Sequence, residues 1–238
     1  MKKISHNKLN LFVLISLITI MILTNSCSTI KYRKVNIPHS TPEYNQKIEK
    51  LYDECNLSSF NLRYDIFRKA IVGHKYIELN NSNIITIIDF SQPSTAKRFY
   101  VIDIKKRKLL FNTFVAHGEN TGENQAINFS NTNNSKQSSL GFFKTGETYS
   151  GDHGYSIRID GIEKGINNKA RKRDIVIHGA NYVSKNFIDE NGRLGRSWGC
   201  PALPMNIKDK IIDTIKGESC IFVYADDEEY LERSFFIE

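Results

Sequence analysis

The sequence is poor in the residues that define disulfide-rich, fibrous or membrane-spanning proteins. Its 238 residues include four Cys, five Pro and 14 Gly, too few for a disulfide scaffold or a collagen-like repeat. No apolar run reaches the ~20 residues that a membrane-spanning helix requires. The remaining composition, 40% hydrophobic and 25% charged residues, is that of an ordinary globular chain. A length of 238 residues predicts one domain of ordinary size with a small helical addition.

The first residues predict an export signal rather than a folded element. Lys2, Lys3 and Lys8 precede a short apolar run that ends at Leu23, and small polar residues lead from there to Cys27. This order is typical of a secretory signal, and its end resembles a bacterial lipoprotein signal. We therefore expect a signal peptide over 1–27, a lipid on Cys27 that binds the membrane, and a tether over 28–40. The alternative is an uncleaved anchor; in both cases the body of the protein lies in the cell envelope.

The net charge of +7 suggests nucleic acid as a partner, but the positions of the charges argue against it. Three lysines belong to the export signal. A second basic run, residues 105–108, lies between two segments with strand-like composition and predicts a solvated hairpin turn. We therefore expect no nucleic-acid partner.

The rest of the chain predicts a helical pair followed by a β-rich domain. Thr41 and Pro42 form a helix start, and apolar residues follow at helical spacing to Cys55. A second helix is predicted from Ser58 and Ser59 to Gly73, which completes a helical pair over 41–75. From residue 84 the hydrophobic period changes to that of strands. The predicted strands are 84–90, 99–104, 109–117, 140–148, 156–159, 175–178 and 220–224, with a long polar loop over 119–139 and a helix over 207–216.

A histidine and a cysteine are the candidates for chemistry. His178 ends an apolar strand, and Cys200 lies in a glycine-containing stretch that is typical of a turn. A thiol nucleophile needs a neighbouring base and backbone N–H groups aimed at the developing oxyanion. A buried structural histidine beside a core cysteine is the competing interpretation. Cys55 and Cys220 fall in apolar patterns and are expected in the core, where a disulfide between them stays open.

The segments around these two residues resemble the active-site signature of the L,D-transpeptidases, cysteine acyltransferases of the bacterial cell wall. His178-Gly179 matches the His-Gly strand end, and residues 197–200, Ser-Trp-Gly-Cys, match the nucleophile motif. The wider stretch, residues 175–204, is closer to the lipoprotein branch called the murein L,D-transpeptidase catalytic domain. The similarity covers roughly residues 84–224. The best-known members have His at position 198 and other residues after the cysteine, where this chain has Pro and Ala.

The resemblance implies a fold, a reaction and roles for named residues. The expected fold is α+β, a β-rich mixed-sheet sandwich with an N-terminal helical pair, whose catalytic domain spans 76–238. Cys200 is implied as the nucleophile and His178 as the base, oriented by the carbonyl of Gly179. The implied oxyanion donors are the backbone N–H groups of Trp198, Gly199 and Cys200.

The implied substrate is a stem peptide of peptidoglycan, cleaved after the L-centre of its third-position diamino acid. The acyl group passes to an amine, which makes a 3-3 cross-link, or to water. Ser197 is implied as a helper to the histidine, Arg196 as a carboxylate contact and His117 as a wall of the cleft. No cofactor and no metal are implied. A carbapenem is expected to acylate the cysteine, and the oligomeric state stays open.

Two other functions compete with this interpretation. A zinc peptidase of the cell wall is possible on composition, although the spacing of the candidate ligands matches no zinc motif. These candidates are His117, Asp152, His153, His178 and Cys200. A binding lipoprotein that retains the fold without catalysis is the second alternative.

Overall fold

The structure is a computed structural model that describes residues 41–237 of the chain. The predicted signal peptide over 1–27, the lipidated Cys27 and the tether over 28–40 lie outside these residues. Among the helices of 41–237, none combines the length and the apolar character that crossing a bilayer requires.

In residues 41–237, eight strands form one mixed sheet in the order β3-β2-β1-β8-β4-β5-β6-β7. The pairs β1–β8 and β6–β7 are parallel, and the other neighbours are antiparallel. This confirms the α+β class with a mixed sheet. The strands are β1 (Ile84–Asp89), β2 (Phe99–Asp103), β3 (Lys108–Thr113), β4 (Gly141–Gly151), β5 (Gly154–Gly161), β6 (Val176–Ala180), β7 (Ala202–Pro204) and β8 (Cys220–Tyr224).

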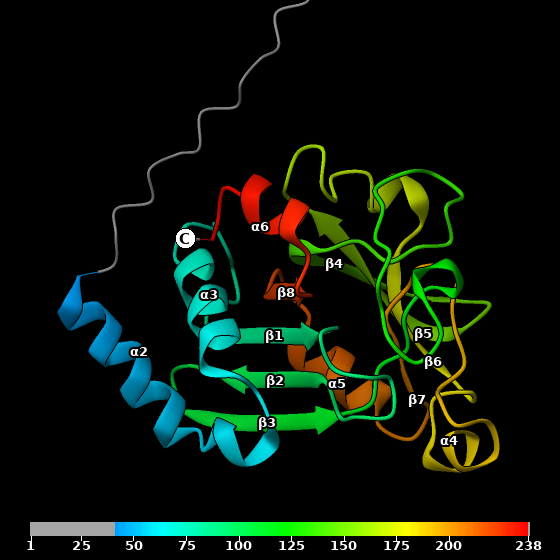
Figure 1. Ribbon diagram of the computed structural model, residues 1–238, viewed down its shortest axis with the longest axis horizontal. Coiled ribbons are helices and arrows are strands. Elements are labelled where there is room, and N and C mark those ends of the chain that lie inside the picture. Colours follow the sequence, from blue (N-terminus) through cyan, green and yellow to red (C-terminus); the bar gives the residue numbers. More distant parts are fainter. Residues whose placement is uncertain (1–40, 238) are drawn as a thin grey trace, which may run out of the picture. The chain divides into compact units, whose positions relative to one another are not determined.

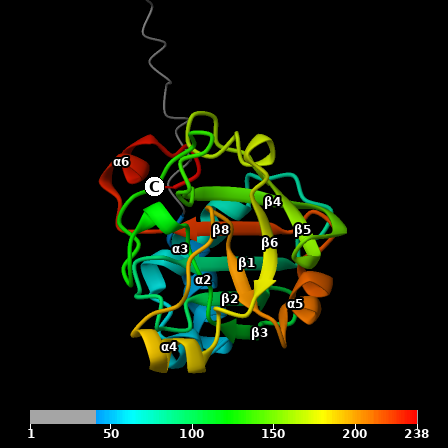
Figure 2. The same cartoon turned by 90° about the vertical axis from the view of Figure 1, so that its right-hand side faces the viewer.

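The sheet bends strongly along its length. Figures 1 and 2 show β5, β6 and β7 running steeply across the direction of β1, β2 and β3. Strands β4 and β5 form a long hairpin whose tip includes Gly154, which has a φ of 70°. Both strands extend beyond the predicted 140–148 and 156–159, because the hairpin continues past the apolar residues that mark a buried strand. This hairpin links the two directions of the sheet.

The predicted N-terminal helical pair is present, but its second helix begins later than the sequence predicts. Helix α2 (Pro42–Glu54) begins at Thr41, whose side chain accepts a hydrogen bond from the Tyr44 amide. The start at Ser58 predicted from the sequence is wrong: residues Leu57–Phe60 form the short 3-10 helix η1, and α3 (Tyr64–His74) follows. Gly73 lies within α3 and does not end it. A Cβ at Gly73 would come within 2.2 Å of the Phe142 ring, so the glycine permits close packing on β4.

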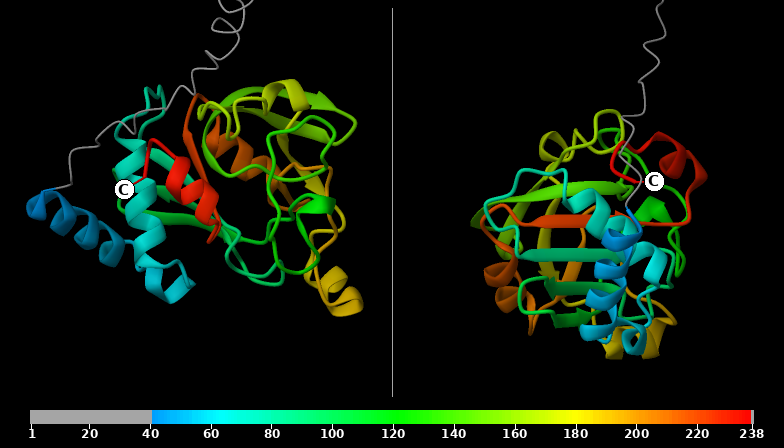
Figure 3. Two further views of the ribbon diagram at one scale, coloured as in Figure 1. Left: turned by 45° about the horizontal axis from the view of Figure 1, so that its top comes forward. Right: turned by 90° about the vertical axis from the view of Figure 1, so that its left-hand side faces the viewer.

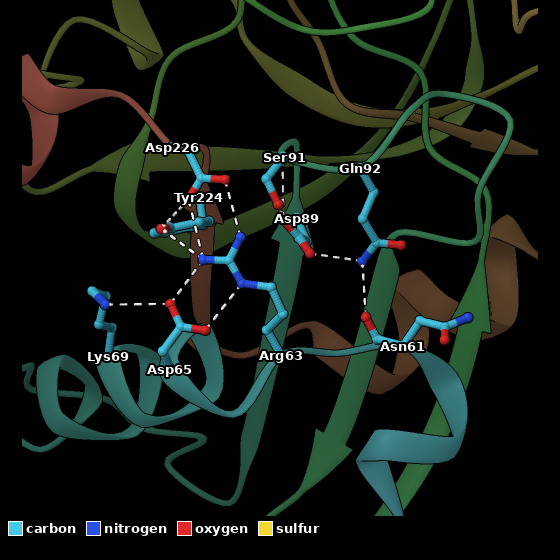
Figure 4. A network of polar contacts seen from close by, with 9 residues as sticks. All are labelled: Asn61, Arg63, Asp65, Lys69, Asp89, Ser91, Gln92, Tyr224 and Asp226. Atoms are coloured by element: carbon cyan, nitrogen blue, oxygen red, sulfur yellow. Dashed lines mark hydrogen bonds and ion pairs between the residues drawn. The ribbon is translucent and has the colours of Figure 1, made fainter.

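Helix α3 is fixed to the sheet by a polar network at its N-terminus (Figure 4). The guanidinium of Arg63 contacts Asp65 at 2.9 Å and Asp226, just after β8, at 3.0 Å. Hydrogen bonds from Arg63 hold the pKa of both carboxyls below their usual range. The right panel of Figure 3 shows α2 and α3 in front of the sheet. The helical pair therefore shares the core of the sheet.

Three further α-helices and the short 3-10 helices η2 (Glu119–Thr121) and η3 (Arg171–Arg173) complete the described chain. Helix α5 (Lys208–Ile215) confirms the predicted 207–216 element and packs against β1, β5 and β6. Helices α4 (Lys185–Asn191) and α6 (Glu228–Arg233) were not predicted. Both are too short to give a clear helical period in the sequence. Residues 104–107 form the turn between β2 and β3, which confirms the predicted turn except that Lys108 already begins β3.

Candidate active site

The parallel pair β6–β7 brings the two candidate residues onto neighbouring segments. His178 pairs with Ala202 in this register, so Cys200, two residues earlier, lies beside Val176. The Val176 amide donates to Sγ of Cys200 at 3.5 Å. The thiol in turn faces the Asp174 carbonyl at 3.7 Å. The thiol thus lies at the start of β6, two residues before His178.

His178 is held as a buried neutral imidazole. Its side chain is only 3% exposed, and Nδ1 lies 2.9 Å from the Gly179 carbonyl. Because a carbonyl only accepts, Nδ1 carries the proton and Nε2 is left with its lone pair. Within residues 41–237, Nε2 has no hydrogen-bond partner, and no hydrogen bond joins His178 to Cys200. The hydrogen bond from Nδ1 to the Gly179 carbonyl is the contact that the predicted orienting role requires.

Burial shifts the pKa values of both groups toward their neutral forms. It lowers the pKa of His178 below 6.5, and the positive charge of Lys208 acts in the same direction. Burial raises the pKa of the Cys200 thiol above 9.0, although the Val176 amide and Arg173 oppose the shift. The resting pair is therefore a thiol and a neutral imidazole, and the proton must move during the reaction.

Ser197 shapes the turn of residues 197–200. Its hydroxyl donates to the Cys200 carbonyl at 2.6 Å and accepts from the Gly199 amide at 3.1 Å. The backbone amide of Ser197 donates to the His117 carbonyl at 2.9 Å. Within residues 41–237, the hydroxyl makes no contact with His178. The geometry therefore makes Ser197 a support for the turn.

The three implied oxyanion donors differ in availability. The Gly199 amide is already bonded to the Ser197 hydroxyl. The amides of Trp198 and Cys200 have no hydrogen-bond partner in the part of the chain that the structure describes. The Trp198 side chain is 75% exposed, and the Lys136 ammonium lies 5.2 Å from its ring centre. Within residues 41–237, two of the three amides therefore have no competing hydrogen bond.

Gly199 has no room for a side chain. Its φ is 122°, and an added Cβ would come within 2.8 Å of the Gln137 carbonyl oxygen. We predict that Gly199→Ala distorts the turn and lowers the rate of Cys200 acylation by about 10-fold or more. Gly192→Ala is the matched control, because Gly192 also has a positive φ of 71° but has open space around its Cβ position. Intact-mass spectrometry measures the acylation rate. Equal rates in the two variants would contradict the prediction.

Arg173 connects the 119–139 loop to this turn. Its half-buried guanidinium lies 3.5 Å from the Cβ position of Gly199. Within residues 41–237 it donates only to neutral acceptors, namely the Ser130 and Gln137 carbonyls and the Ser135 and Ser139 hydroxyls. Ser138 of the same loop also donates to the Gly199 carbonyl at 3.1 Å. The long polar loop therefore packs on the turn and brings a positive charge toward the thiol.

His117 lies beneath the site rather than along an open cleft. It is 1% exposed, and its Nδ1 accepts from Arg98 at 2.7 Å while Nε2 faces the Gly122 carbonyl at 3.2 Å. Burial, followed by Arg98, lowers the pKa of His117 to about 4. This places a neutral histidine below the turn, where its own carbonyl receives the Ser197 amide.

Arg196 already has a carboxylate partner within the chain. Its Nη1 contacts Glu123 at 2.7 Å and also donates to the carbonyls of Glu119 and Gly122. Arg193 contacts the other oxygen of Glu123 at 2.8 Å. A substrate carboxylate at Arg196 would therefore have to displace Glu123.

The zinc interpretation gains no support from this geometry. In residues 41–237, no three His, Cys, Asp or Glu side chains are grouped as metal ligands. His117 in particular uses Nδ1 to accept from an arginine. Cys55 and Cys220 are buried free thiols, so the disulfide left open by the sequence is not formed here.

Residues 58–224 match a family model described as the L,D-transpeptidase catalytic domain. The chain belongs to the L,D-transpeptidase family. This confirms the resemblance to the family and identifies a catalytic domain of peptidoglycan-modifying enzymes, whereas the lipoprotein branch stays a prediction. A search of curated proteins gives no match.

Solved structures of L,D-transpeptidases are similar to this chain in fold. One, from Mycobacterium smegmatis, shares 13% identity with a TM-score of 0.37 over 60% of this chain and 59% of that one. Another, from Stackebrandtia nassauensis, shares 13% identity with a TM-score of 0.36 over 76% and 77%. The helical cell shape determining protein Pgp2 from Campylobacter jejuni shares 16% identity with a TM-score of 0.39 over 61% and 48%. The chain thus spans less than two thirds of the first and the last of these.

In this L,D-transpeptidase family member, sequence reasoning missed the residues that support the motif. Arg173 and Arg98 each donate to main-chain carbonyls of segments remote in sequence. His153, considered only as a zinc ligand, lies against the His178 ring. No local pattern marks these residues, because their partners are defined only once the strands have paired.

Proposed function

We propose that this L,D-transpeptidase domain uses Cys200 and His178 to cleave and transfer stem peptides of peptidoglycan. The observation that carries the proposal is the free Nε2 of a buried His178, fixed by the Gly179 carbonyl on the strand next to the thiol segment. A neutral imidazole with one free nitrogen is the form that accepts a proton from a thiol. Membership of the family supplies the substrate class.

In the proposed reaction, Sγ of Cys200 attacks the carbonyl after the L-centre of the third-position diamino acid. The thiol proton passes to Nε2 of His178 and then to the nitrogen of the terminal D-alanine, whose bond to the acyl carbon breaks. A thioester remains. An amine of a second stem, or water, then attacks this thioester, gives its proton to His178 and releases Cys200, to which the proton returns. For the first step Sγ must leave the Asp174 carbonyl, which is within the reach of a side-chain rotation.

The amides of Trp198 and Cys200 are the proposed oxyanion donors in both steps. Their availability supports this role, whereas the Gly199 amide keeps the turn in shape through Ser197. Removing one such donor costs about 3 kcal/mol of barrier in acyl-transfer enzymes. The turn therefore contributes to the rate through its backbone.

The decisive test is incubation of the full chain with purified tetrapeptide muropeptides, followed by mass analysis. Cross-linked dimer indicates transfer to an amine, and trimmed tripeptide indicates transfer to water. A pentapeptide-only substrate is the control, because it lacks the free tetrapeptide end. Absence of both products, from protein whose fold is verified by circular dichroism, would contradict the proposal.

The pH profile follows from the neutral resting pair. Burial holds the pKa of His178 below 6.5, so the base stays neutral and competent as the pH falls to that value. We expect kcat/KM to be level from about pH 7 to 8.5 and to fall only below pH 6.5, since this ratio reports the free enzyme. The measurement is kcat/KM for thioester formation across this range. A loss of kcat/KM on acidification that is centred above pH 7 would contradict this expectation. A loss as the pH rises from about 7 to 8.5 would indicate a preformed thiolate–imidazolium pair, because its imidazolium must stay protonated.

A catalytically silent peptidoglycan-binding protein is the second candidate. It is favoured by the position of the Cys200 thiol, which faces the Asp174 carbonyl at 3.7 Å rather than the imidazole. Catalytic hydrogen bonds often form only once substrate is present, so this position is compatible with activity. Binding of muropeptides without either product would favour the silent protein.

We also propose that the enzyme acts in the cell envelope, attached to the membrane by a lipid on Cys27. The support is the basic, then apolar, then small-residue order of residues 1–27. Residues 28–40 then serve as a tether to the domain. Metabolic labelling with a fatty-acid analogue, lost on Cys27→Ala, tests the anchor.

A further inference from the structure

A second histidine from a distant segment covers the ring of His178. His153 lies in the tip of the β4–β5 hairpin, between residues 151 and 154. Its ring is stacked on the ring of His178, with centroids 4.2 Å apart and an interplanar angle of 20°. His153 is itself exposed, so it covers the buried His178 from the solvent side. The hairpin tip therefore forms part of the surroundings of the proposed base.

Helix α5 anchors the hairpin tip at Tyr155, two residues after His153. Lys208 of α5 is 5% exposed, and its ammonium donates to the Tyr155 carbonyl at 3.2 Å. The Tyr155 hydroxyl donates to Asp213, also on α5, at 3.0 Å. The stem of Lys208 also lies against Gly179, where an added Cβ would come within 2.1 Å of it. The same helix thus holds both the hairpin tip and the strand that carries His178.

Two contacts restrict the orientation of the His178 ring: a hydrogen bond at its edge and a stacked ring on its face. The hydrogen bond from Nδ1 to the Gly179 carbonyl holds one edge but leaves the ring free to tilt about that bond. A flat ring stacked on its face removes this freedom. Together the two contacts set the direction of Nε2, the atom that must receive the thiol proton.

We propose that His153 is a positioning residue that holds the ring plane of His178 for proton transfer from Cys200. The inference rests on the proposed function. It assigns a role to the β4–β5 hairpin tip in acyl transfer, and a planar side chain at position 153 is what the role requires.

Charge adds a second consequence of the stack. A positive charge on the His153 ring disfavours a proton on the His178 ring stacked against it. The titratable groups that act on His178 are His153 from the hairpin and Lys208 from α5, while Asp152 is next to His153 in the turn. The pKa of His178 is lowered first by burial and then by His153 and Lys208. Loss of the second imidazole therefore raises the pKa of His178.

The kinetic test compares His153→Ala with His153→Phe. We expect His153→Ala to lower kcat for muropeptide conversion by about 10- to 100-fold with little change in KM, because the base is misplaced. His153→Phe keeps a flat ring and is expected to retain kcat within about threefold. Asp152→Ala is the matched control for the exposed turn and should behave as wild type. A His153→Ala enzyme with the kcat of wild type, or a His153→Phe enzyme as slow as His153→Ala, would overturn the proposal.

A titration of the His178 ring by NMR separates this inference from the proposed function, because it needs no substrate. The midpoint is expected to rise in both variants of His153 and to stay unchanged in Asp152→Ala. An unchanged midpoint in both variants would overturn the proposal that His153 acts on the His178 ring, even in an active enzyme. A raised midpoint in a protein that converts no muropeptide would support the stack and contradict the proposed function alone.

Discussion

Replacing Cys200 by Ala is expected to lower the rate of muropeptide conversion by on the order of 10⁴-fold or more, because the nucleophile is lost entirely. Within residues 41–237, the thiol accepts from the Val176 amide at 3.5 Å, donates to the Asp174 carbonyl at 3.7 Å and packs, partly buried, against the core. Ala keeps the Cβ atom and removes only these weak hydrogen bonds, so we expect the fold to stay intact. Product formation by mass spectrometry measures the rate, and circular dichroism checks the fold.

A carbapenem gives an independent measure of the same thiol. Wild-type protein is expected to gain one adduct in its intact mass, and Cys200→Ala none. Cys55→Ala is the matched control, because Cys55 is buried and burial raises its pKa to about 11. Conversion by Cys200→Ala at the wild-type rate, or an adduct that persists in it, would show that another residue reacts.

Replacing Arg98 by Met is expected to lower the free energy of unfolding by about 3 kcal/mol and Tm by roughly 6–12 °C. The Arg98 guanidinium is fully buried and donates to the carbonyls of Val115 and Gln92 and to Nδ1 of His117. Burial lowers the pKa of Arg98 to about 9, so it stays charged at neutral pH. Met fills most of the volume but leaves two buried acceptors, the Val115 carbonyl and Nδ1 of His117, and the half-buried Gln92 carbonyl without this donor. Thermal and urea unfolding measure the loss.

The matched control for this change is Arg107→Met in the β2–β3 turn. Arg107 makes an ion pair with Glu54 but its side chain is 56% exposed, so the expected change is within about 0.5 kcal/mol. Arg98→Met is also expected to slow acylation, since His117 supports the amide of Ser197. Equal stability of the two variants would mean that the buried hydrogen bonds of Arg98 contribute nothing net.

Local sequence patterns were sufficient for most elements of this fold. The Ile-rich segment 84–89 is buried along its whole length as β1, and the helix start at Thr41 is present. Both depend only on residues close in sequence. The apolar pattern of 84–89 predicts the strand, and the Thr41 side chain caps the helix. The start at Ser58 failed because helical spacing of Phe60 and Tyr64 also suits a short 3-10 turn followed by a break.

The candidate site likewise has residues that the motif predicted and contacts that only the structure shows. The motif identified Cys200, His178 and Gly179, and the register of β6 and β7 places them on adjacent segments. It did not indicate that Arg196 is paired with Glu123 or that Ser197 serves the turn. Those partners lie on segments that meet only in three dimensions.

The sequence by itself indicated seven of the eight strands and the family motif, and it predicts an export signal, because each of these patterns lies in neighbouring residues. The three-residue strand β7 (Ala202–Pro204) was not predicted. Tertiary structure alone decided the surroundings of the thiol: the arginine that holds the long loop, the buried Arg98 and the His153 ring on His178. Parallel pairing of β1 with β8 likewise joins strands from opposite ends of the domain. The physical reason is that such contacts depend on the path of the whole backbone, and a side chain carries no local sign of a partner brought to it from far along the chain.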